Sequence, residues 1–417
     1  MTEKARKRVV WLYDGDHLNH PFIRQAAESL VDVGYSVTIL DRAITSGRTR
    51  YRHIALGQLV PHLNGVRLKK AERQEREQTH WPRSRVTVPD RLLVKALSAA
   101  KIIVPVQWRS RLNTSSFLSR ILLHTIARRP AIIIATSPTV AAMGWLASEV
   151  LRSRFVYYPF ELYGEQHVQV PRLWRRVELQ ILRRGVHALI TQNEERARIY
   201  VQERGARVEP SIVHNYKRRQ RVVRVGKLRT LLGLPDDVRI VLYEGSLSPG
   251  RWLEKLVESA PHLPDDTRLV FMGKKFSWWM QNVEPLLIAP EMARKILIVP
   301  EVSHSELLNY VADAEVGIII YDDQVRNNYY CAPGKLSDYV LAGVPVVAPN
   351  FPTIAPIISH YAIGATFTSP EPVEIARAII RVLSVPREAW QTALQRAQED
   401  LVWETQAPGF LTAVGGE

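Results

Sequence analysis

The stretch at residues 327–349, NNYYCAPGKLSDYVLAGVPVVAP, has the pattern of a short helix followed by a buried strand. A Pro-Gly pair precedes the expected helix, and Gly343 ends it before an apolar run. Lys335 falls at the helix N-terminus, where unpaired N–H groups and the helix dipole favour an anion. Asp338 shares its face and could accept hydrogen bonds from a ribose diol. The stretch is typical of a nucleotide-binding α/β unit, although a plain helix–strand junction has the same apolar pattern.

A second turn of this kind, EGSLSPG at residues 244–250, joins an apolar run to a helix that begins near Arg251. Glycine lets the backbone approach a diphosphate, and an arginine in the first helical turn can bind phosphate oxygens with two hydrogen bonds. The turn is neither a G-x-G-x-x-G fingerprint nor a P-loop, and structural turns have similar compositions. The two segments together therefore indicate a nucleotide site more strongly than either does alone.

Apolar runs alternate with helical patterns along the whole chain, which predicts parallel sheets covered by helices. The 417 residues are too many for one ordinary core, so we expect an α/β protein with two Rossmann-like, doubly wound domains facing across a cleft. The expected strands are residues 9–13, 37–40, 132–135, 155–158, 188–191 and 211–213 in the first half, and 240–243, 269–272, 296–299, 316–320, 344–348 and 365–367 in the second.

The domain boundary is predicted from the basic segment YKRRQRVVRVGKLR, which separates the two sets of strands. We expect a first domain at residues 1–215, a basic linker at 216–230 and a second domain at 231–390. Residues 51–90 have no clear period and are expected to form an exposed excursion from the first domain.

The charge of the chain is uneven, because residues 1–250 hold 43 Lys and Arg against 21 Asp and Glu, whereas residues 251–417 hold 13 against 20. A basic first half favours an anionic partner, either a phospholipid surface or nucleic acid, although a solvated basic face has the same composition. Two basic amphipathic helices expected at 91–104 and 115–129 favour an anionic membrane surface. The basic residues that interrupt or flank them include Arg109, Arg111, Arg120, Arg128 and Arg129. The chain has no interleaved basic-aromatic repeat, so nucleic acid is not an expected partner.

The single cysteine, Cys331, excludes an internal disulfide framework and favours a reducing compartment. The basic N-terminus leads directly into a strand pattern and does not resemble a secretory signal. Prolines and polar residues interrupt both long uncharged runs, so no membrane-spanning helix is expected. The predicted location is cytoplasmic, with peripheral attachment to the cytoplasmic membrane.

Two segments carry a resemblance to a known family, YEGSLSPGRWLEKLVES at residues 243–259 and APGKLSDYVLAGVPVVA at 332–348. Together they resemble the donor-binding domain of GT-B fold glycosyltransferases, specifically the retaining family 4 with its group 1 type C-terminal domain. The resemblance covers roughly residues 238–405. Trp403 and Glu404 are similar to the family's C-terminal Trp-Glu, after which the chain returns to the first domain. The resemblance thus implies a returning helical segment at 391–417.

The resemblance implies that the chain transfers a sugar from a nucleotide diphosphate sugar to a hydroxyl group, with retention and with no metal or other cofactor. Arg251 and Lys335 would offset charge on the departing diphosphate and so act in catalysis. Asp338 stands where the family usually has Glu and would hold the ribose. The implied donor-binding residues are Gly245, Ser246, Arg251, Glu301, Val302, Asn327, Lys335, Leu336 and Asp338.

Two positions depart from the family pattern. The family has Glu-x7-Glu, and its first acidic position is Tyr330 in this chain. Related first domains often have Tyr-Asp-x-His-Glu, where this chain has YYPFE, so that Phe160 replaces the histidine. These departures leave open two alternatives, a GT-B nucleotide-sugar epimerase and a catalytically inactive nucleotide-binding protein.

The loop DGDHLNH, which follows the first expected strand, includes an Asp-x-Asp pair beside two histidines. Hard cations bind such carboxylates, but the position of the loop favours acceptor binding at the cleft, and helix capping is a third possibility. The acceptor is expected to be a polyprenyl- or other lipid-linked glycan in bacterial surface polysaccharide assembly, and the transferred sugar a hexose or N-acetylhexosamine. The acceptor-side candidates are Asp14, Asp16, His17, Asn19 and Glu161.

Overall fold

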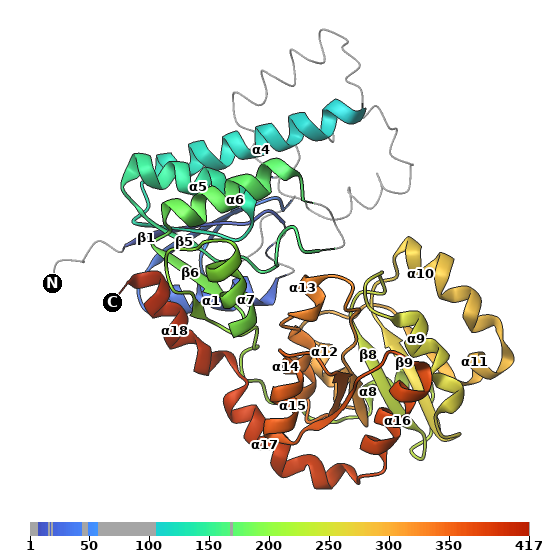
Figure 1. Ribbon diagram of the computed structural model, residues 1–417. Coiled ribbons are helices and arrows are strands. Elements are labelled where there is room, and N and C mark those ends of the chain that lie inside the picture. Colours follow the sequence, from blue (N-terminus) through green and yellow to red (C-terminus); the bar gives the residue numbers. More distant parts are fainter. Residues whose placement is uncertain are drawn as a thin grey trace, which may run out of the picture.

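Two parallel β-sheets, each flanked by helices, form two domains in the computed structural model (Figure 1). The structure describes residues 7–15, 17, 20–43, 49–56, 106–166 and 170–416, with the backbone alone for 106–114. The predicted fold class, α/β with two doubly wound domains, is confirmed.

The first sheet has the strand order β3-β2-β1-β4-β5-β6-β7, and its strands are all parallel. Alternate residues of each strand point to opposite faces, so one core packs under α1 and α18 and the other under α4, α5 and α6. The strands are β1 (Arg8–Leu12), β2 (Ser36–Asp41), β3 (Arg52–Ala55), β4 (Ile132–Ala135), β5 (Arg154–Tyr157), β6 (Ala188–Thr191) and β7 (Ser211–Ile212). The helices are α1 (Pro21–Asp32), α4 (Val106–Arg128), α5 (Pro138–Leu151), α6 (Arg172–Arg184), α7 (Glu194–Arg198) and a π-helical turn at Ile199–Glu203.

The second sheet has the order β10-β9-β8-β11-β12-β13 and is also parallel. Its strands are β8 (Arg239–Glu244), β9 (Thr267–Met272), β10 (Ile296–Val299), β11 (Val316–Ile318), β12 (Val346–Pro349) and β13 (Gly364–Phe367). Its helices are α8 (Lys227–Leu232), α9 (Leu253–Glu258), α10 (Ser277–Asn282), α11 (Pro290–Lys295), α12 (Leu307–Val311), α13 (Arg326–Tyr329), α14 (Gly334–Leu341), α15 (Ala355–Tyr361), α16 (Pro372–Leu383) and α17 (Gln391–Asp400), with short 3₁₀ turns at Ala260–His262, Glu284–Ile288 and Arg387–Trp390.

Tyr339 fixes α14 to the centre of the second sheet. Its buried hydroxyl lies 2.9 Å from the carbonyl oxygen of Leu242 in β8 and 3.1 Å from that of Ile318 in β11. Gly317 makes room for the ring, because a Cβ at this position would lie 2.3 Å from a ring carbon of Tyr339. The contact sets the place of Lys335, which lies one helical turn earlier in α14.

The chain crosses between the domains at the linker and again at α18 (Trp403–Gly415). Helix α17 packs against α14 and α15 of the second domain, whereas α18 packs against α1, β6 and β7 of the first. At the second crossing, the indole N–H of Trp403 donates to Ser29 at 2.9 Å, and its backbone N–H donates to the carbonyl of Lys217 at 2.9 Å. The two crossings therefore lie side by side.

Two expectations for the first domain need correction. Residues 52–55, which were expected in an exposed excursion, form strand β3 and pair in parallel with β2. Its polar composition suits the edge position that it holds in the sheet, and this composition hid the strand. Helix α4 begins at Val106, well before the expected helix start at residue 115, while the helix expected at 91–104 lies outside the described residues. No helix in the described part of the chain is long and apolar enough to cross a membrane.

Candidate active site

Two cations meet at the carboxyl end of β8. A Cβ at Gly245 would lie 2.8 Å from Nζ of Lys335 and would displace the ammonium group, and the φ of +122° favours glycine at this position. Lys335 lies 3.4 Å from the hydroxyl of Tyr321, and the guanidinium of Arg251 lies 5.5 Å from the centre of the same ring. Both predicted phosphate-binding residues therefore converge on Tyr321 beside the N-terminus of α14, a position that favours an anion.

The surroundings of Lys335 keep it protonated. Burial lowers the pKa of its ammonium group, but Tyr321, Tyr243 and Glu244 raise it, and the net pKa lies above the ordinary lysine value. The ammonium also lies 5.4 Å from the centre of the Tyr243 ring, a cation–π arrangement. Lys335 is thus a half-buried positive charge with aromatic neighbours, which suits a phosphate group.

Asp338 is buried and forms an ion pair with Lys217, which lies in the predicted linker. The backbone N–H of Lys217 also donates to the hydroxyl of Ser337 at 2.9 Å. Sequence reasoning assigned Asp338 to a ribose and did not find Lys217, because nothing in the linker sequence shows that its first lysine folds back onto α14. The pair brings a linker residue into the candidate site.

Glu244 ends β8 and is a second carboxyl group that sequence reasoning missed. It is buried, and its Oε1 has no hydrogen-bond partner among the described residues. Burial and the nearby Asp338 raise the pKa of Glu244 to about 7, while Lys335 and Lys217 act in the opposite direction. Two acids and two lysines thus share the space beside Gly245.

The remaining predicted donor residues are placed differently from one another. Glu301 is exposed and Val302 is half-buried, and both follow β10 directly. Burial lowers the pKa of His304, whereas Asp338 and Glu301 raise it. Ser246 is half-buried, and its carbonyl accepts a hydrogen bond from Tyr243. The side chain of Leu336 packs in the core of the second domain, because it lies on the inner face of α14.

Asn327 lies at the contact between the domains. Its Oδ1 accepts hydrogen bonds from the backbone N–H of Leu162 at 2.8 Å and from Arg196 at 3.2 Å. Its own backbone N–H donates to the carbonyl of Glu165 at 2.9 Å. The residue predicted to bind the donor therefore joins the second domain to the loop after β5.

The loop after β1 is fastened to its own domain. Asp14 pairs with Arg42 and accepts a hydrogen bond from Thr139 at 2.6 Å. His17, predicted to line a cleft, is fully buried, and its Nδ1 lies 2.6 Å from a carboxylate oxygen of Asp41. In this structure His17 is thus enclosed by the first domain. Asp16 and Asn19 lie outside the described residues.

The YYPFE segment brings Phe160 against a histidine from the loop after β1. The ring centres of Phe160 and His20 are 4.5 Å apart. Burial is the main cause that lowers the pKa of His20 to about 4, and His17 and His304 add to it, so the imidazole is neutral at pH 7. The carboxylate of Glu161 is half exposed and lies 3.7 Å from the guanidinium of Arg196.

We predict that Glu244→Gln raises the melting temperature at pH 8 much more than at pH 5. A carboxyl whose folded pKa is raised destabilises the fold as the pH rises from its unfolded pKa, about 4.3, through its folded pKa of about 7. Glutamine removes that ionisation. Thermal unfolding from pH 5 to pH 8 measures the effect, with the exposed Glu291→Gln as control. Equal gains at both pH values would show that Glu244 stays ionised.

Solved structures share this arrangement of two domains over nearly the whole chain. HepE of Anabaena, in complex with UDP-glucose, matches with a TM-score of 0.69 at 14% identity, covering 99% of this chain and 100% of that one. The sucrose-phosphate synthase of Thermosynechococcus elongatus matches with a TM-score of 0.69 at 17% identity, over 97% of each chain. WaaG, a glycosyltransferase involved in lipopolysaccharide biosynthesis, matches with a TM-score of 0.65 at 12% identity, over 98% of this chain and 100% of its own. No protein-family model and no curated protein sequence matches. The chain has the two-domain GT-B fold of these glycosyltransferases.

Proposed function

We propose that this protein is a glycosyltransferase that transfers a hexosyl- or N-acetylhexosaminyl-type sugar from a nucleotide diphosphate sugar to a hydroxyl group. One observation carries the proposal: Lys335 and Arg251 converge beside Gly245 at the N-terminus of α14. Structures of the same fold contain UDP and UDP-glucose, which supports a nucleotide-sugar donor here.

In the proposed reaction, the second domain binds the donor and stabilises the leaving group. Lys335 and Arg251 hold the diphosphate and offset the negative charge that grows on it as the sugar departs. Asp338 accepts hydrogen bonds from the ribose hydroxyls through the carboxylate oxygen that Lys217 does not contact. The site needs no metal for this role, because two cations and a helix N-terminus supply the positive potential.

The imidazole of His20 supports an active enzyme despite the departure at Phe160. Because the two rings are neighbours, a neutral imidazole lies beside the position where related proteins have a histidine. The runner-up function, a nucleotide-sugar epimerase, needs an acidic group near the donor, and Glu244 is such a group. Transfer requires an acceptor hydroxyl, whereas epimerisation does not.

We predict that Lys335→Ala and Arg251→Ala each weaken UDP binding roughly tenfold or more, because each removes a charge-assisted contact of about 1.5–3 kcal/mol. Asp338→Ala should weaken UDP but not inorganic pyrophosphate, since it removes the ribose acceptor, and the negative charge that it also removes does not favour either phosphate ligand. Isothermal titration calorimetry measures all three, with the exposed Arg381→Ala as control. Unchanged UDP affinity in both cation variants would refute the donor site.

We further propose that transfer retains the anomeric configuration. Asp14 is held by Arg42 and Thr139, and His17 is held by Asp41. Glu161 lies 3.7 Å from the guanidinium of Arg196, so none of the described acceptor-side candidates is a ready general base. We expect NMR of the product to show the donor's anomeric configuration and His20→Ala to keep measurable turnover. An inverted product together with loss of kcat in His20→Ala would overturn retention. A new sugar epimer formed without any acceptor would favour the epimerase instead.

A membrane-bound, lipid-linked acceptor is the acceptor class that we propose, in assembly of surface polysaccharide at the cytoplasmic face of the membrane. Helices α4, α5 and α6 pack in sequence on one face of the first sheet (Figure 1). They expose apolar side chains, namely Leu123, Leu146, Val150 and Leu173. Exposed arginines on α6 surround Leu173, which makes this face suitable for an anionic lipid surface.

We predict that the protein sediments with anionic liposomes and that binding falls as salt rises, because salt screens the attraction between arginine and lipid. The double change Arg172→Glu and Arg176→Glu on α6 should release it. The matched change Arg294→Glu and Arg381→Glu, on the second domain, should not. These positions are preferred to Arg120 and Arg128, which donate to carbonyl groups of their own domain. Liposome binding that depends neither on the salt concentration nor on the α6 double change would contradict the proposal.

A further inference from the structure

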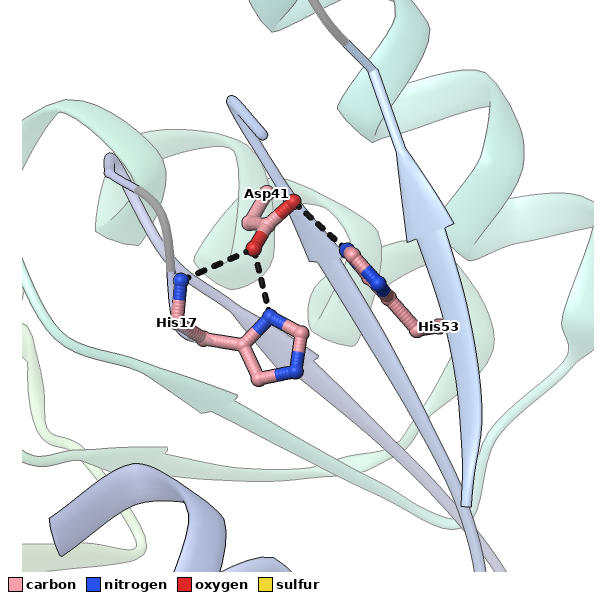
Figure 2. Close-up of side chains that lie close together, drawn as sticks. All are labelled: His17, Asp41 and His53. Atoms are coloured by element: carbon pink, nitrogen blue, oxygen red, sulfur yellow. Dashed lines mark hydrogen bonds and ion pairs between the residues drawn. The ribbon is translucent and has the colours of Figure 1, made fainter. Parts of the chain in front are cut away.

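Three side chains with metal-binding atoms meet in the first domain (Figure 2). His17 comes from the loop after β1, Asp41 from the end of β2 and His53 from β3. Nδ1 of His17 lies 2.6 Å from Oδ2 of Asp41, and Nε2 of His53 lies 2.9 Å from Oδ1. Figure 2 shows both rings directed toward the carboxylate from different sides.

The cluster is enclosed and its carboxylate is held in place. The side chains of His17 and Asp41 are fully buried, and that of His53 is 1% exposed. The backbone N–H groups of His17 and Ala43 donate to the two oxygens of Asp41, each at 3.0 Å. Backbone donors of this kind orient a ligating carboxylate, and ligands on neighbouring strands lose little freedom when they bind an ion.

We propose that His17, Asp41 and His53 bind one divalent transition-metal ion of the Zn²⁺ class. Imidazole nitrogen and carboxylate oxygen are ligands that Zn²⁺ uses, at about 2.0–2.2 Å from the ion. One ligand atom from each residue lies within 4.8 Å of the others, so small side-chain movements would bring all three to one ion. Bonds of about 2.0–2.2 Å at a tetrahedral ion place two ligand atoms about 3.4 Å apart, so binding requires the 2.6 and 2.9 Å nitrogen–oxygen separations to widen by roughly 0.5–0.8 Å.

The site differs from the Asp-x-Asp pair in the sequence, because Asp14 pairs with Arg42 and takes no part in the cluster. An ion here would fasten the loop after β1 to the edge of the first sheet, and the proposal does not depend on the proposed transferase function. A closed hydrogen-bond network, in which both imidazoles donate protons to Asp41, would occupy the same geometry. The affinity of the protein for a metal ion distinguishes a metal site from this hydrogen-bond network.

The test uses the full chain without a polyhistidine tag, stripped with a chelator and titrated with Zn²⁺ alone by calorimetry. We expect one tight equivalent, a rise in melting temperature, and visible d–d absorption of a low-coordinate site when Co²⁺ replaces Zn²⁺. His17→Gln and His53→Gln can still donate an N–H to Asp41, and each should weaken Zn²⁺ binding by about tenfold or more. His360→Gln, an exposed histidine on α15, is the matched control and should bind normally.

Asp41→Asn provides a second variant that keeps the shape of the side chain while removing the anionic ligand. Circular dichroism of each metal-free variant shows whether it is folded. Failure of the folded wild type to bind Zn²⁺ or Co²⁺, or unchanged affinity in the folded glutamine and asparagine variants, would overturn the metal site and leave the hydrogen-bond network. Either result leaves the donor-site proposal untouched, since UDP binding is measured separately.

Discussion

The hydrogen bonds that Arg196 and Asn193 donate to the carbonyl of Tyr330, at 2.9 and 3.2 Å, determine how the two domains meet. Arg196 is almost fully buried, and a buried guanidinium is stable only where its N–H groups find acceptors. Its acceptors come from both domains, because it also donates to the carbonyl of Phe160 at 2.7 Å. Separating the domains would leave this charge short of partners, so the arginine favours the observed contact.

Acidic groups offset part of the positive charge of the candidate site before any ligand arrives. Asp338 has Lys217 as its partner, whereas Glu244 lies near Lys335 with one oxygen unpartnered. A carboxylate beside a diphosphate would repel it, so protonation of Glu244 and anion binding favour each other. Lys335, Arg251 and Lys217 outnumber the acids in both states, and the positive potential for phosphate is strongest while Glu244 is neutral. Lys335 and Arg251 by themselves would not reveal that anion binding depends on the protonation of Glu244.

The sequence predicted the features that depend on local pattern. The central strands were found because they are apolar and buried on both faces, and Lys335 was found because a Pro-Gly pair marks the start of α14. Strand β3 was missed because an edge strand needs no apolar run. Lys217, Glu244 and the pairing of His17 with Asp41 were missed because each depends on contacts between residues far apart in the chain, and no spacing rule reports such contacts.

Asn327 shows how one short segment can serve both domains. The first half of this segment, residues 326–331, is hydrogen-bonded to the first domain through Asn327 and the carbonyl of Tyr330. An ion pair also joins Arg326 to Glu203. The second half of the segment continues into α14, where Lys335 faces Gly245. Because the two halves are only a few residues apart, a displacement of the first domain must move the start of α14 or break the buried bonds of Arg196. The position of Lys335, the proposed phosphate-binding lysine, is therefore coupled to the domain that is proposed to bind the acceptor.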